Sequence, residues 1–445
     1  MLPGKAEMGR RLRHQAPVSG KIRSLRNDGR GRMLVEGAEY LVEDALPGEE
    51  VIAEPFRKSR GRVEARVQSV LVPSADRVTP RCEAYGDCGG CRLQHMDATA
   101  QLAWKQDLLL DDLGAKAVSF GRLLEPITSS PWNYRRRARL GVKSVPAKGR
   151  VLVGFRERGA PYICDCRRCE ILDGPTGGLF ESLSELVGRL TICAAVPQVE
   201  VAQADNATAL VFRVLEPPSS QDLVEFEKFA RDQAVQVFLQ SGGLETVTPL
   251  HMDQPGLFYR LPDFDLEMEF RPTDFVQVNA QVNRAMVARA IELLECRANS
   301  RVLDLFCGMG NFSLALGRRA GQVTGVDSDL ALIERAGLNA QRNGLDNVSF
   351  EQGDLYQEAV AGDWLKGKFD RVLLDPPRAG AAQILEHLPA LGAGRLVYVS
   401  CGPESFVQDA AVLTGRLGYR LEAVGVMDMF PHTLHVETMG LFVME

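Results

Sequence analysis

Short apolar runs separated by turn residues fill residues 16–72. Segments such as GRMLVEGAEYLV and GRVEARVQSVLV alternate apolar and polar positions, and glycine or proline bounds them. A period of two is typical of strands that bury one face, and closely spaced turns favour a small barrel. We therefore expect residues 16–74 to form a five-stranded, OB-like barrel of the kind that binds nucleic acid. Residues 1–15 are expected to be a flexible basic tail.

A different pattern runs from residue 301 onward. The apolar segments RVLDLF, QVTGVD, VSFEQGD, FDRVLLDPP and RLVYVSC alternate with helical stretches such as NFSLALGRR and SDLALIERAGLNAQRNG, and two more strand candidates follow. Strands that alternate with helices of this length predict an α/β fold with a doubly wound, mostly parallel, Rossmann-like sheet, which we assign to residues 271–445. Ligands of such sheets bind at the carboxyl ends of the strands.

The intervening residues 75–270 mix both periodicities. Amphipathic helices are expected around residues 98–114, 175–190 and 221–233, among several strand candidates. This mixture predicts a central α+β domain whose topology the pattern does not fix. Residues 73–80 (PSADRVTP) are polar and bounded by proline, which is typical of a linker.

Length and cysteine content narrow the class of protein. With 445 residues the chain is long enough for about three domains. No segment approaches the roughly 18 apolar residues of a membrane span, and no apolar region follows the basic N-terminus as in a secretory signal. Ten cysteines in such a chain indicate metal binding or catalysis rather than disulfides. We therefore expect a cytoplasmic protein with no membrane partner and no obligate protein partner.

Charge is distributed unevenly along the chain. The net charge is −6, but residues 120–170 hold 12 Lys and Arg against 4 Asp and Glu. A solvated charge run is the usual explanation of such clusters. An aromatic neighbour and nearby cysteines favour RNA binding by Arg135, Arg136 and Arg137, which follow Tyr134. Phe275 is a further candidate, either for base stacking or for the core.

The segment DLFCGMGNF (304–312) joins the first Rossmann strand to its helix. Its two glycines, Gly308 and Gly310, allow a tight turn and the close approach of a ligand, while Ser313 occupies the third glycine position of a dinucleotide fingerprint. NAD and FAD are therefore disfavoured. A lone acidic residue at a strand end is usually a cap or turn residue. Acidic residues at three successive strand ends suit ribose hydroxyls, an adenine amine and a sulfonium. We therefore predict that Asp327, Asp354 and Asp375 bind S-adenosylmethionine.

The next strand ends identify the atom that is methylated. Arg378, in DPPR, stands where enzymes that methylate amines commonly carry an aromatic residue, so an amine target is disfavoured. Carbon 5 of uracil is too electron-poor to attack a methyl group until a thiolate adds to carbon 6. Cys401 ends LVYVS and precedes a Gly-Pro turn, which favours a nucleophile over a buried inert cysteine. Glu437, in PHTLHVETM, is the candidate base for the carbon-5 proton, or a solvated strand residue.

Three cysteines lie close together after the linker. Cys82, Cys88 and Cys91 are separated by five and then two residues, with glycines between them. The segment ICDCRRC supplies candidates for a fourth ligand in Cys164, Cys166 and Cys169. On spacing alone, zinc and an iron–sulfur cluster are equally compatible with these four thiolates.

Taken together, these segments resemble the RlmD (RumA) type of 23S ribosomal-RNA uridine-C5 methyltransferases. The similarity runs from about residue 16 to the end and rests on RVTPRCEAYGDCGGC, YRRRARL, FVQVN, VLDLFCGMGNFSLAL, LLDPPRAGA, VYVSCGP and MDMFPHTLHVETM. The resemblance implies an N-terminal TRAM barrel, a central domain with a [4Fe–4S] cluster and a SAM-methyltransferase domain. It implies Cys169 as the fourth cluster ligand, Cys401 as the nucleophile and Glu437 as the base. It also implies methyl-donor contacts at Gln277, Phe306, Asn311, Asp327, Asp354 and Asp375.

The resemblance further implies that the target is the uridine conventionally numbered 1939 in 23S RNA, presented single-stranded or flipped. Methylation of the uridine numbered 747, or of both, stays open. So does a non-catalytic ribosomal-RNA-binding module, whereas the CxxxCxxC spacing of radical enzymes is absent. Two residues depart from the family pattern: Gly402 replaces the asparagine of SCNP, and Asp327 replaces a more usual glutamate. Cys164 and Cys166 are additional thiols without an assigned role.

Overall fold

The computed structural model describes residues 10–11, 15–59, 61–357 and 361–444. Most of the predicted tail over residues 1–15 lies outside them. The chain forms two compact units. The first comprises Met1–Trp104, Arg156–Pro161 and Pro431–Leu434, and the second comprises Lys105–Phe155, Tyr162–Phe430 and His435–Glu445. Because these units divide the chain differently from the domains expected from the sequence, the boundaries at residues 75 and 271 stay predictions.

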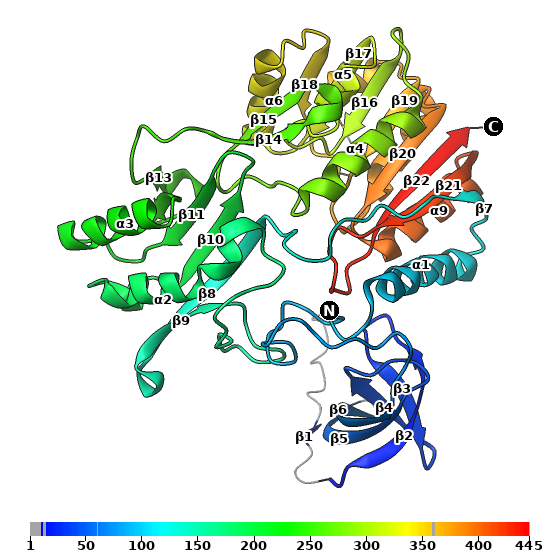
Figure 1. Ribbon diagram of the computed structural model, residues 1–445. Coiled ribbons are helices and arrows are strands. Elements are labelled where there is room, and N and C mark those ends of the chain that lie inside the picture. The colour runs from blue at the N-terminus through cyan, green and yellow to red at the C-terminus, as the bar shows by residue number, and fades with distance from the viewer. Residues whose placement is uncertain (1–9, 12–14, 60, 358–360, 445) are drawn as a thin grey trace. The chain divides into compact units, whose positions relative to one another are not determined.

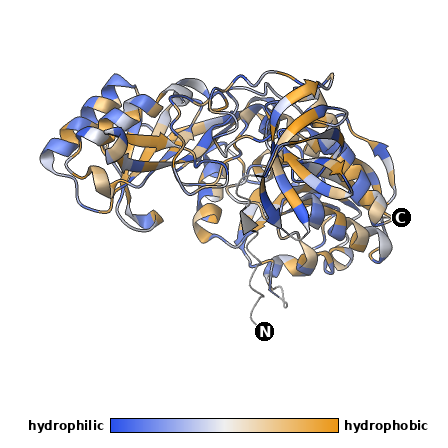
Figure 2. Ribbon diagram, turned by 90° about the horizontal axis from the view of Figure 1, so that it is seen from below, coloured by the Kyte–Doolittle hydropathy of each residue, from blue (hydrophilic) through white to orange (hydrophobic). Residues whose placement is uncertain are grey.

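The first unit contains the predicted five-stranded barrel. Its strands are β2 (Val18–Leu25), β3 (Gly31–Val35), β4 (Ala38–Glu43), β5 (Glu50–Ser59) and β6 (Arg62–Val72), and the short β1 (Arg10–Arg11) pairs with β5. Pairing of β5 with β6 closes the order β5-β2-β3-β4-β6, with only β4 and β6 parallel. Alternate residues such as Ile22, Met33 and Val42 are fully buried, which is why the strands carry both hydrophobic and hydrophilic colours in Figure 2. The period-two pattern is confirmed.

The second unit contains a six-stranded sheet of order β13-β12-β11-β10-β8-β9, in which only β11 and β12 are parallel. Helices α2 (Phe180–Arg189) and α3 (Ser220–Asp232) pack on β9 and β12 (Figure 1). Both helices lie where amphipathic helices were predicted, although α2 begins later because residues 174–178 form a 3-10 turn. The strands are β8 (Arg137–Val145), β9 (Arg150–Gly154), β10 (Gln198–Gln203), β11 (Thr208–Arg213), β12 (Gln236–Gln240) and β13 (Val247–Pro249).

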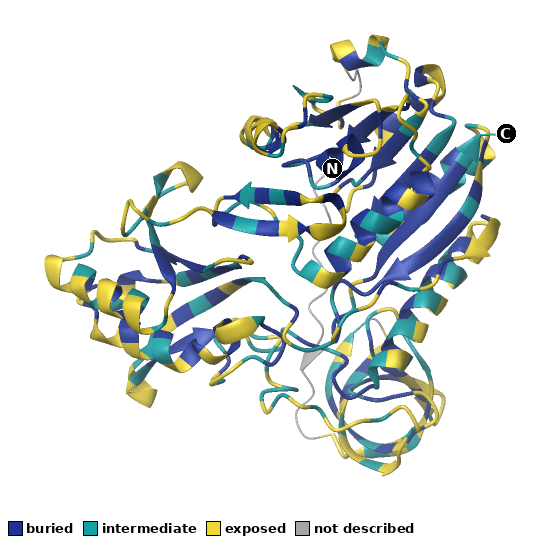
Figure 3. Ribbon diagram, turned by 45° about the horizontal axis from the view of Figure 1, so that its top comes forward, coloured by how far each residue is buried: buried dark blue, intermediate teal, exposed yellow. Residues whose placement is uncertain are grey.

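The second unit also contains an eight-stranded sheet of order β18-β17-β16-β19-β20-β22-β21-β7, mostly buried in Figure 3. The first five strands are mutually parallel, and β22 inserts antiparallel between β20 and β21. The predicted doubly wound sheet is therefore confirmed, with β7 as an added edge strand. The strands are β7 (Phe120–Leu123), β16 (Arg301–Leu305), β17 (Gln322–Asp327), β18 (Val348–Gln352), β19 (Arg371–Leu374), β20 (Arg395–Ser400), β21 (Tyr419–Met427) and β22 (Glu437–Met444).

The helices associated with this sheet include α4 (Ala280–Leu294), which packs on β19, β20 and β22, and α9 (Pro403–Gly415), which packs on β21 and β22. Helix α5 is shorter than predicted because Asn311 and Phe312 belong to the preceding turn. The hairpin of β14 (Leu257–Leu261) and β15 (Leu266–Phe270) shares the core of this sheet. The remaining helices are α1 (Ala98–Ala115), α5 (Ser313–Gly317), α6 (Leu330–Arg342), α7 (Ala382–Leu385) and α8 (Leu388–Leu391). Among the described residues, no helix is long and apolar enough to cross a lipid bilayer.

Candidate active site

The loop after β16 has the backbone geometry of a ligand-binding turn. Gly308 and Gly310 take left-handed conformations with φ of 53° and 91°, and Phe306 does so with φ of 64° although it is not glycine. A side-chain carbon at Gly310 would lie 2.4 Å from Leu314 Cδ1. Left-handed geometry is costly for residues with a Cβ, so the strain at Phe306 marks a backbone shape that the fold enforces.

The three predicted acidic residues lie at three strand ends along this edge. Asp327 Oδ2 accepts a hydrogen bond of 2.9 Å from the Gly308 N–H, so the end of β17 is tied to the glycine loop. Asp354 Oδ1 accepts from the Tyr356 N–H at 3.0 Å. Asp375 follows β19, and its own N–H donates to the Leu305 carbonyl at 3.3 Å. The structure thus brings these three residues to one edge of the sheet.

Two other predicted donor contacts lie beside them. The Phe306 ring contacts the Tyr356 ring, with centroids 5.5 Å apart, and forms an aromatic wall. Hydrogen bonds fix the side chain of Asn311. Its Oδ1 accepts from the Tyr259 hydroxyl and from Asn283, each at 3.0 Å, and its Nδ2 donates to Asn283. Asn311 therefore has one remaining amide hydrogen for a ligand.

Gln277 lies between β15 and α4 in the segment that also contains Phe275, whose side chain is 70% exposed. The groups along this edge of the sheet fit S-adenosylmethionine. The carboxylates can bind its ribose hydroxyls and its amine, and the rings of Phe306 and Tyr356 can cover its adenine. The glycine turn lets the ligand approach the backbone closely.

The predicted nucleophile and base lie at adjacent strand ends. Cys401 directly follows β20, and Glu437 is the first residue of β22. The two strands are antiparallel and their pairing ends with Ser400 opposite Thr438, so Cys401 and Glu437 are the residues immediately beyond the last pair. Cys401 is half-buried, whereas Glu437 is buried. A thiol and a carboxylate therefore lie next to each other, and Asp375 lies at the end of the neighbouring strand.

Burial dominates the electrostatics of this group. It raises the pKa of Glu437 to about 8, and the charge of Asp375 adds to the rise, while Lys105 and Arg378 oppose it. Burial also raises the pKa of Asp375 to about 7. The pKa of the Cys401 thiol is raised by burial and by Glu437 and Asp375, with Arg378 in opposition. Near neutral pH the site therefore holds protons that exposed groups of the same kinds would release.

The loop after β19 is hydrogen-bonded to the segment before β22 and packs closely on the turn that contains the nucleophile. Arg378 Nη2 lies 2.9 Å from His435 Nδ1. The Gly402 carbonyl accepts from the Ser400 and Ser405 hydroxyls, at 3.1 and 2.9 Å. A Cβ at Gly402 would lie 3.2 Å from the Arg378 carbonyl oxygen, although its φ of −133° is open to any residue. Glycine here permits close packing of the two loops rather than an unusual backbone.

The predicted cluster ligands belong to both units. Cys82, Cys88 and Cys91 lie in one turn-rich loop of the first unit, where the Gly90 N–H points at Cys88 Sγ at 3.4 Å. An N–H donor favours a thiolate, so this loop fits a thiolate-ligated metal. Cys169 belongs to the second unit, and Cys166 packs there against the six-stranded sheet. Within the described part of the chain, no group of three or more Cys, His, Asp or Glu side chains is arranged to hold a metal.

The loop of cysteines is anchored inside its own unit. The Tyr85 hydroxyl donates to Asp44 Oδ1 at 2.9 Å, and Arg158 holds the same carboxylate at 2.8 Å. The Gly89 N–H donates to the Arg156 carbonyl at 2.9 Å. Asp44 directly follows β4, so these contacts connect the loop to the barrel.

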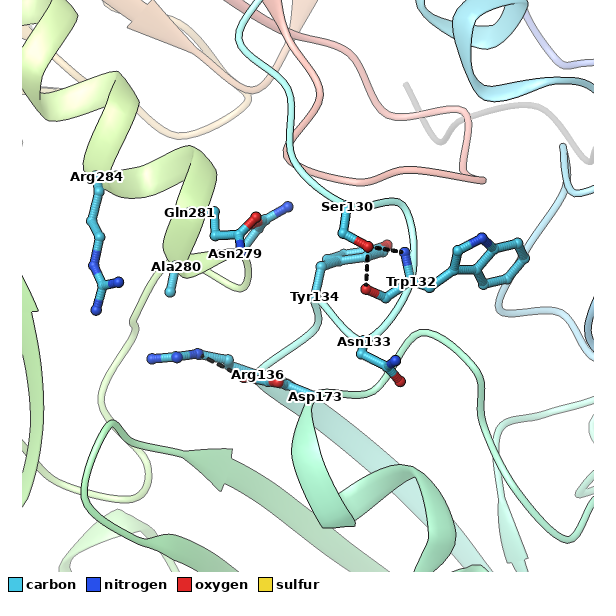
Figure 4. Close-up of a pocket in the computed structure, with 10 residues that line it drawn as sticks. All are labelled: Ser130, Trp132, Asn133, Tyr134, Arg136, Asp173, Asn279, Ala280, Gln281 and Arg284. Carbon is cyan, nitrogen blue, oxygen red and sulfur yellow. Dashed lines mark hydrogen bonds and ion pairs between the residues drawn. The ribbon is translucent and has the colours of Figure 1, made fainter.

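The three predicted RNA-binding arginines all make contacts within the second unit. Arg136 pairs with Asp173, at 2.9 Å, and with Asp205, which also pairs with Arg284 of α4. Arg137 donates to the Pro272 carbonyl, and Arg135 to the Arg137 carbonyl. In Figure 4, Arg136 and Arg284 extend toward the same side of a pocket. Ser130, Trp132, Asn133, Tyr134, Arg136, Asp173, Asn279, Ala280, Gln281 and Arg284 line it. RNA contact by these arginines stays a prediction.

Sequence reasoning missed three residues of the site. Tyr356 lies two residues after a predicted ligand but belongs to no motif. Asp304 is fully buried on β16, burial raises its pKa to about 8, and its Oδ1 has no hydrogen-bond partner among the described residues. Lys105 is buried on α1 beside Leu109 and Leu113, where a charged residue in an apolar stripe was a visible signal.

The strand order, the glycine loop and the acidic strand ends define an S-adenosylmethionine-dependent methyltransferase. A family model described as tRNA (Uracil-5-)-methyltransferase matches residues 207–445. The chain is 48% identical over 440 residues to an Alkalilimnicola ehrlichii protein named 23S rRNA (uracil(1939)-C(5))-methyltransferase RlmD, covering 98% of this chain and 99% of the relative. It therefore belongs to the family of RNA uracil-C5 methyltransferases.

Two further comparisons agree. A Methylococcus capsulatus protein with the same name is 42% identical, with 96% of this chain and 97% of the relative covered. The crystal structure of Pyrococcus abyssi tRNA (uracil-54, C5)-methyltransferase in complex with S-adenosyl-L-homocysteine has a TM-score of 0.73 at 24% identity, covering 96% of this chain and all of that one. The second likeness shows a shared fold.

Proposed function

We propose that this protein methylates carbon 5 of uridine 1939 in 23S ribosomal RNA, with S-adenosylmethionine as donor, Cys401 as nucleophile and Glu437 as base. The observation that carries the proposal is that Cys401 and Glu437 lie next to each other, immediately beyond the last pair of β20 and β22. The relatives from Alkalilimnicola ehrlichii and Methylococcus capsulatus, which match almost end to end, are named for this reaction and this uridine.

The donor is held by the residues around the glycine loop. Asp327 and Asp354 bind ribose and adenine groups, Phe306 and Tyr356 cover the base, and Gln277, Asn311 and Asp375 complete the contacts. When bound, the donor supplies an electrophilic methyl group. The residues that hold the donor and the residues Cys401 and Glu437 lie along the same edge of the sheet. A uracil that reaches the Cys401 thiol therefore also reaches the methyl group of the donor.

The reaction then follows from the chemistry of the two residues. The Cys401 thiolate adds to carbon 6 of the uracil, and the electron density this places on carbon 5 attacks the methyl group. The bond from the methyl group to sulfur breaks, and S-adenosyl-L-homocysteine leaves. Glu437 removes the proton from carbon 5, carbon 5 and carbon 6 regain their double bond, and the thiolate leaves. Because burial raises the pKa of both Cys401 and Glu437, we expect turnover to rise with pH up to about 8.

We also propose that Cys82, Cys88, Cys91 and Cys169 ligate a [4Fe–4S] cluster and that the barrel is a TRAM domain that binds RNA. In the second unit, we propose that Arg135, Arg136, Arg137 and Phe275 also contact RNA. The support is the thiol content and spacing of the loop and the N–H donated to Cys88. Iron and sulfide assays on the purified protein test the cluster, with Cys193→Ala as the matched control for Cys82→Ala. A protein that binds zinc and no iron contradicts it.

The reaction is tested with unmodified 23S RNA and isotopically labelled donor, followed by mass spectrometry of nuclease fragments. We expect label on carbon 5 of one uridine, at position 1939. Cys401→Ala should lower turnover by at least ~10⁴-fold, as expected when a covalent nucleophile is removed. Cys296→Ala, which changes another half-buried thiol, should retain activity. Full activity in Cys401→Ala, or no labelled RNA from the unmutated protein, contradicts the proposal.

A further inference from the structure

Lys105 is a buried cation that the proposed reaction does not use. Its side chain is 1% exposed and lies on α1 beside Leu109 and Leu113. Its Nζ donates to Asp428 Oδ1 at 2.7 Å and to the Phe430 carbonyl at 3.1 Å. Withdrawing an ammonium group from water is costly, and lysine is seldom fully buried unless it is paired. A hydrophobic residue would suit this stripe without that cost.

The groups that Lys105 holds lie at the start of the segment that leads to Glu437. Asp428 directly follows β21, and its N–H donates to the Ile127 carbonyl at 2.8 Å. The segment ends where β22 begins with Glu437. Met427 and Glu437 face each other across β21 and β22, so the position of Asp428 and that of the base are linked by one strand pair.

The charged and titratable groups that act on Glu437 come from three elements. Asp375 follows β19 and Cys401 follows β20, while Arg378 lies in the loop after β19 and Lys105 on α1. Arg378 is exposed and contacts His435, whereas Lys105 is buried. A buried charge is screened less by water and salt than an exposed one. The charge of Lys105 is therefore screened less by salt than that of Arg378, and its ion pair with Asp428 offsets part of it.

We propose that Lys105 is a positioning residue: it fixes the residues after β21 and favours the ionised form of the Glu437 carboxylate, which accepts the carbon-5 proton. The proposal rests on the proposed function, in which Glu437 is the base. It assigns to α1 a part in the last step of the reaction that no motif of the chain indicates.

The step shows what the charge contributes. After methyl transfer the carbon-5 proton moves to a Glu437 oxygen, the electrons of that C–H bond form the double bond between carbons 5 and 6, and the bond from carbon 6 to Cys401 Sγ breaks. Only an ionised Glu437 can accept the proton. Without the ammonium group, burial and Asp375 act on Glu437 with less opposition, so its pKa rises further above about 8. The methylated RNA then stays attached to Cys401 for longer.

The test compares three variants across pH. Lys105→Met should move the rising limb of the turnover profile by about one pH unit to higher pH, which is about a tenfold loss below the limb. It should also accumulate a denaturant-stable, methyl-labelled protein–RNA adduct. Lys105→Arg should keep the limb near its original position. Arg77→Met removes a cation paired with the buried Glu49 in the first unit, so it controls for the loss of an ion pair.

The proposal is overturned if the rising limb of the turnover profile stays at the same pH in Lys105→Met and no adduct accumulates. It is also overturned if Arg77→Met shifts the limb as far as Lys105→Met does. A second measurement needs no RNA. Infrared titration of the carboxyl band that is lost in Glu437→Gln should give a midpoint near 8 in the unmutated protein and a higher one in Lys105→Met. Equal midpoints overturn the proposal even if the RNA substrate is another one. Failure of the proposed function appears separately, as unlabelled RNA or as active Cys401→Ala.

Discussion

The two halves of the strand-end edge of the eight-stranded sheet are built by different means. The donor half, formed by the loops after β16, β17 and β18, is a backbone construction: left-handed residues at 306, 308 and 310, and acidic side chains tied to nearby N–H groups. The acceptor half, formed by the ends of β19, β20 and β22, is an electrostatic construction in which Asp375, Cys401 and Glu437 are crowded together. Binding needs a fixed shape, whereas proton transfer needs shifted pKa values.

The largest effect is expected in the acceptor half. Glu437→Gln keeps the size of the side chain but cannot accept the carbon-5 proton, so steady-state turnover should fall by about 10²- to 10⁴-fold. One methyl group per enzyme should still be transferred, because the thiol and the donor half are unchanged. Single-turnover labelling, followed by denaturing electrophoresis, checks this through an RNA-linked protein band.

The matched control is Glu422→Gln on β21, which changes a glutamate that pairs with Arg420 away from the reacting groups. It should show neither slow turnover nor an adduct. If Glu437→Gln released product at the normal rate, the base would be another residue, and the acceptor half would lose its distinguishing feature.

A smaller effect is expected in the donor half. Gly310→Ala places a Cβ at a φ of 91° and against Leu314, so we expect the affinity for S-adenosyl-L-homocysteine to fall by about 10- to 100-fold. Isothermal titration calorimetry measures the change. At saturating donor, the single-turnover rate should recover, since the acceptor half is intact.

Gly337→Ala serves as the control because the space around Gly337 in α6 is open, and alanine favours a helix. If Gly310→Ala and Gly337→Ala lowered the affinity for S-adenosyl-L-homocysteine equally, the backbone geometry of the glycine loop would not be what determines binding. That outcome would remove the contrast between the halves.

The last expected effect concerns stability and leaves the donor half unchanged. The folded protein holds a proton on Glu437 up to about pH 8, whereas the unfolded chain releases it near its ordinary value of 4.5. The contribution of this proton to the free energy of unfolding is therefore complete below pH 4.5. It is lost as pH rises through about 8. Compared with the unmutated protein, Glu437→Gln should therefore gain free energy of unfolding between pH 5 and pH 8.5, by on the order of 3–4 kcal/mol. Urea unfolding measures it, and equal differences at both pH values contradict it.

The contrast also explains what could be predicted from the sequence. The donor half follows from short motifs, because Gly308, Gly310 and the strand-end acids act through local backbone geometry. The barrel and the parallel sheet follow from hydrophobic periodicity. The local pattern also predicted that Cys401 and Glu437 lie at strand ends. That they lie next to each other depends on the insertion of β22 between β20 and β21, which the pattern did not predict.

The remaining features depend on groups that are distant in sequence. Lys105 reaches the vicinity of Glu437 only through the fold, and Asn283 and Tyr259 support Asn311 from other elements. The contacts of the arginine run could not be anticipated either, because Asp173 and Asp205 are remote from Arg136 in the chain. Helix α5 is shorter than its apolar pattern suggested, since the turn before it takes up Asn311 and Phe312.

The position of β22 has a kinetic consequence. It follows β21 in the chain but lies between β20 and β21 in the sheet, so β21 cannot join the parallel strands until β22 has been inserted. Contacts between sequence-distant strands form slowly because the loop must first be ordered. A nascent or partly unfolded chain can therefore complete its glycine loop while its thiol still lacks a neighbouring carboxylate. We therefore expect the thiol and its carboxylate to meet only after the parallel strands have formed.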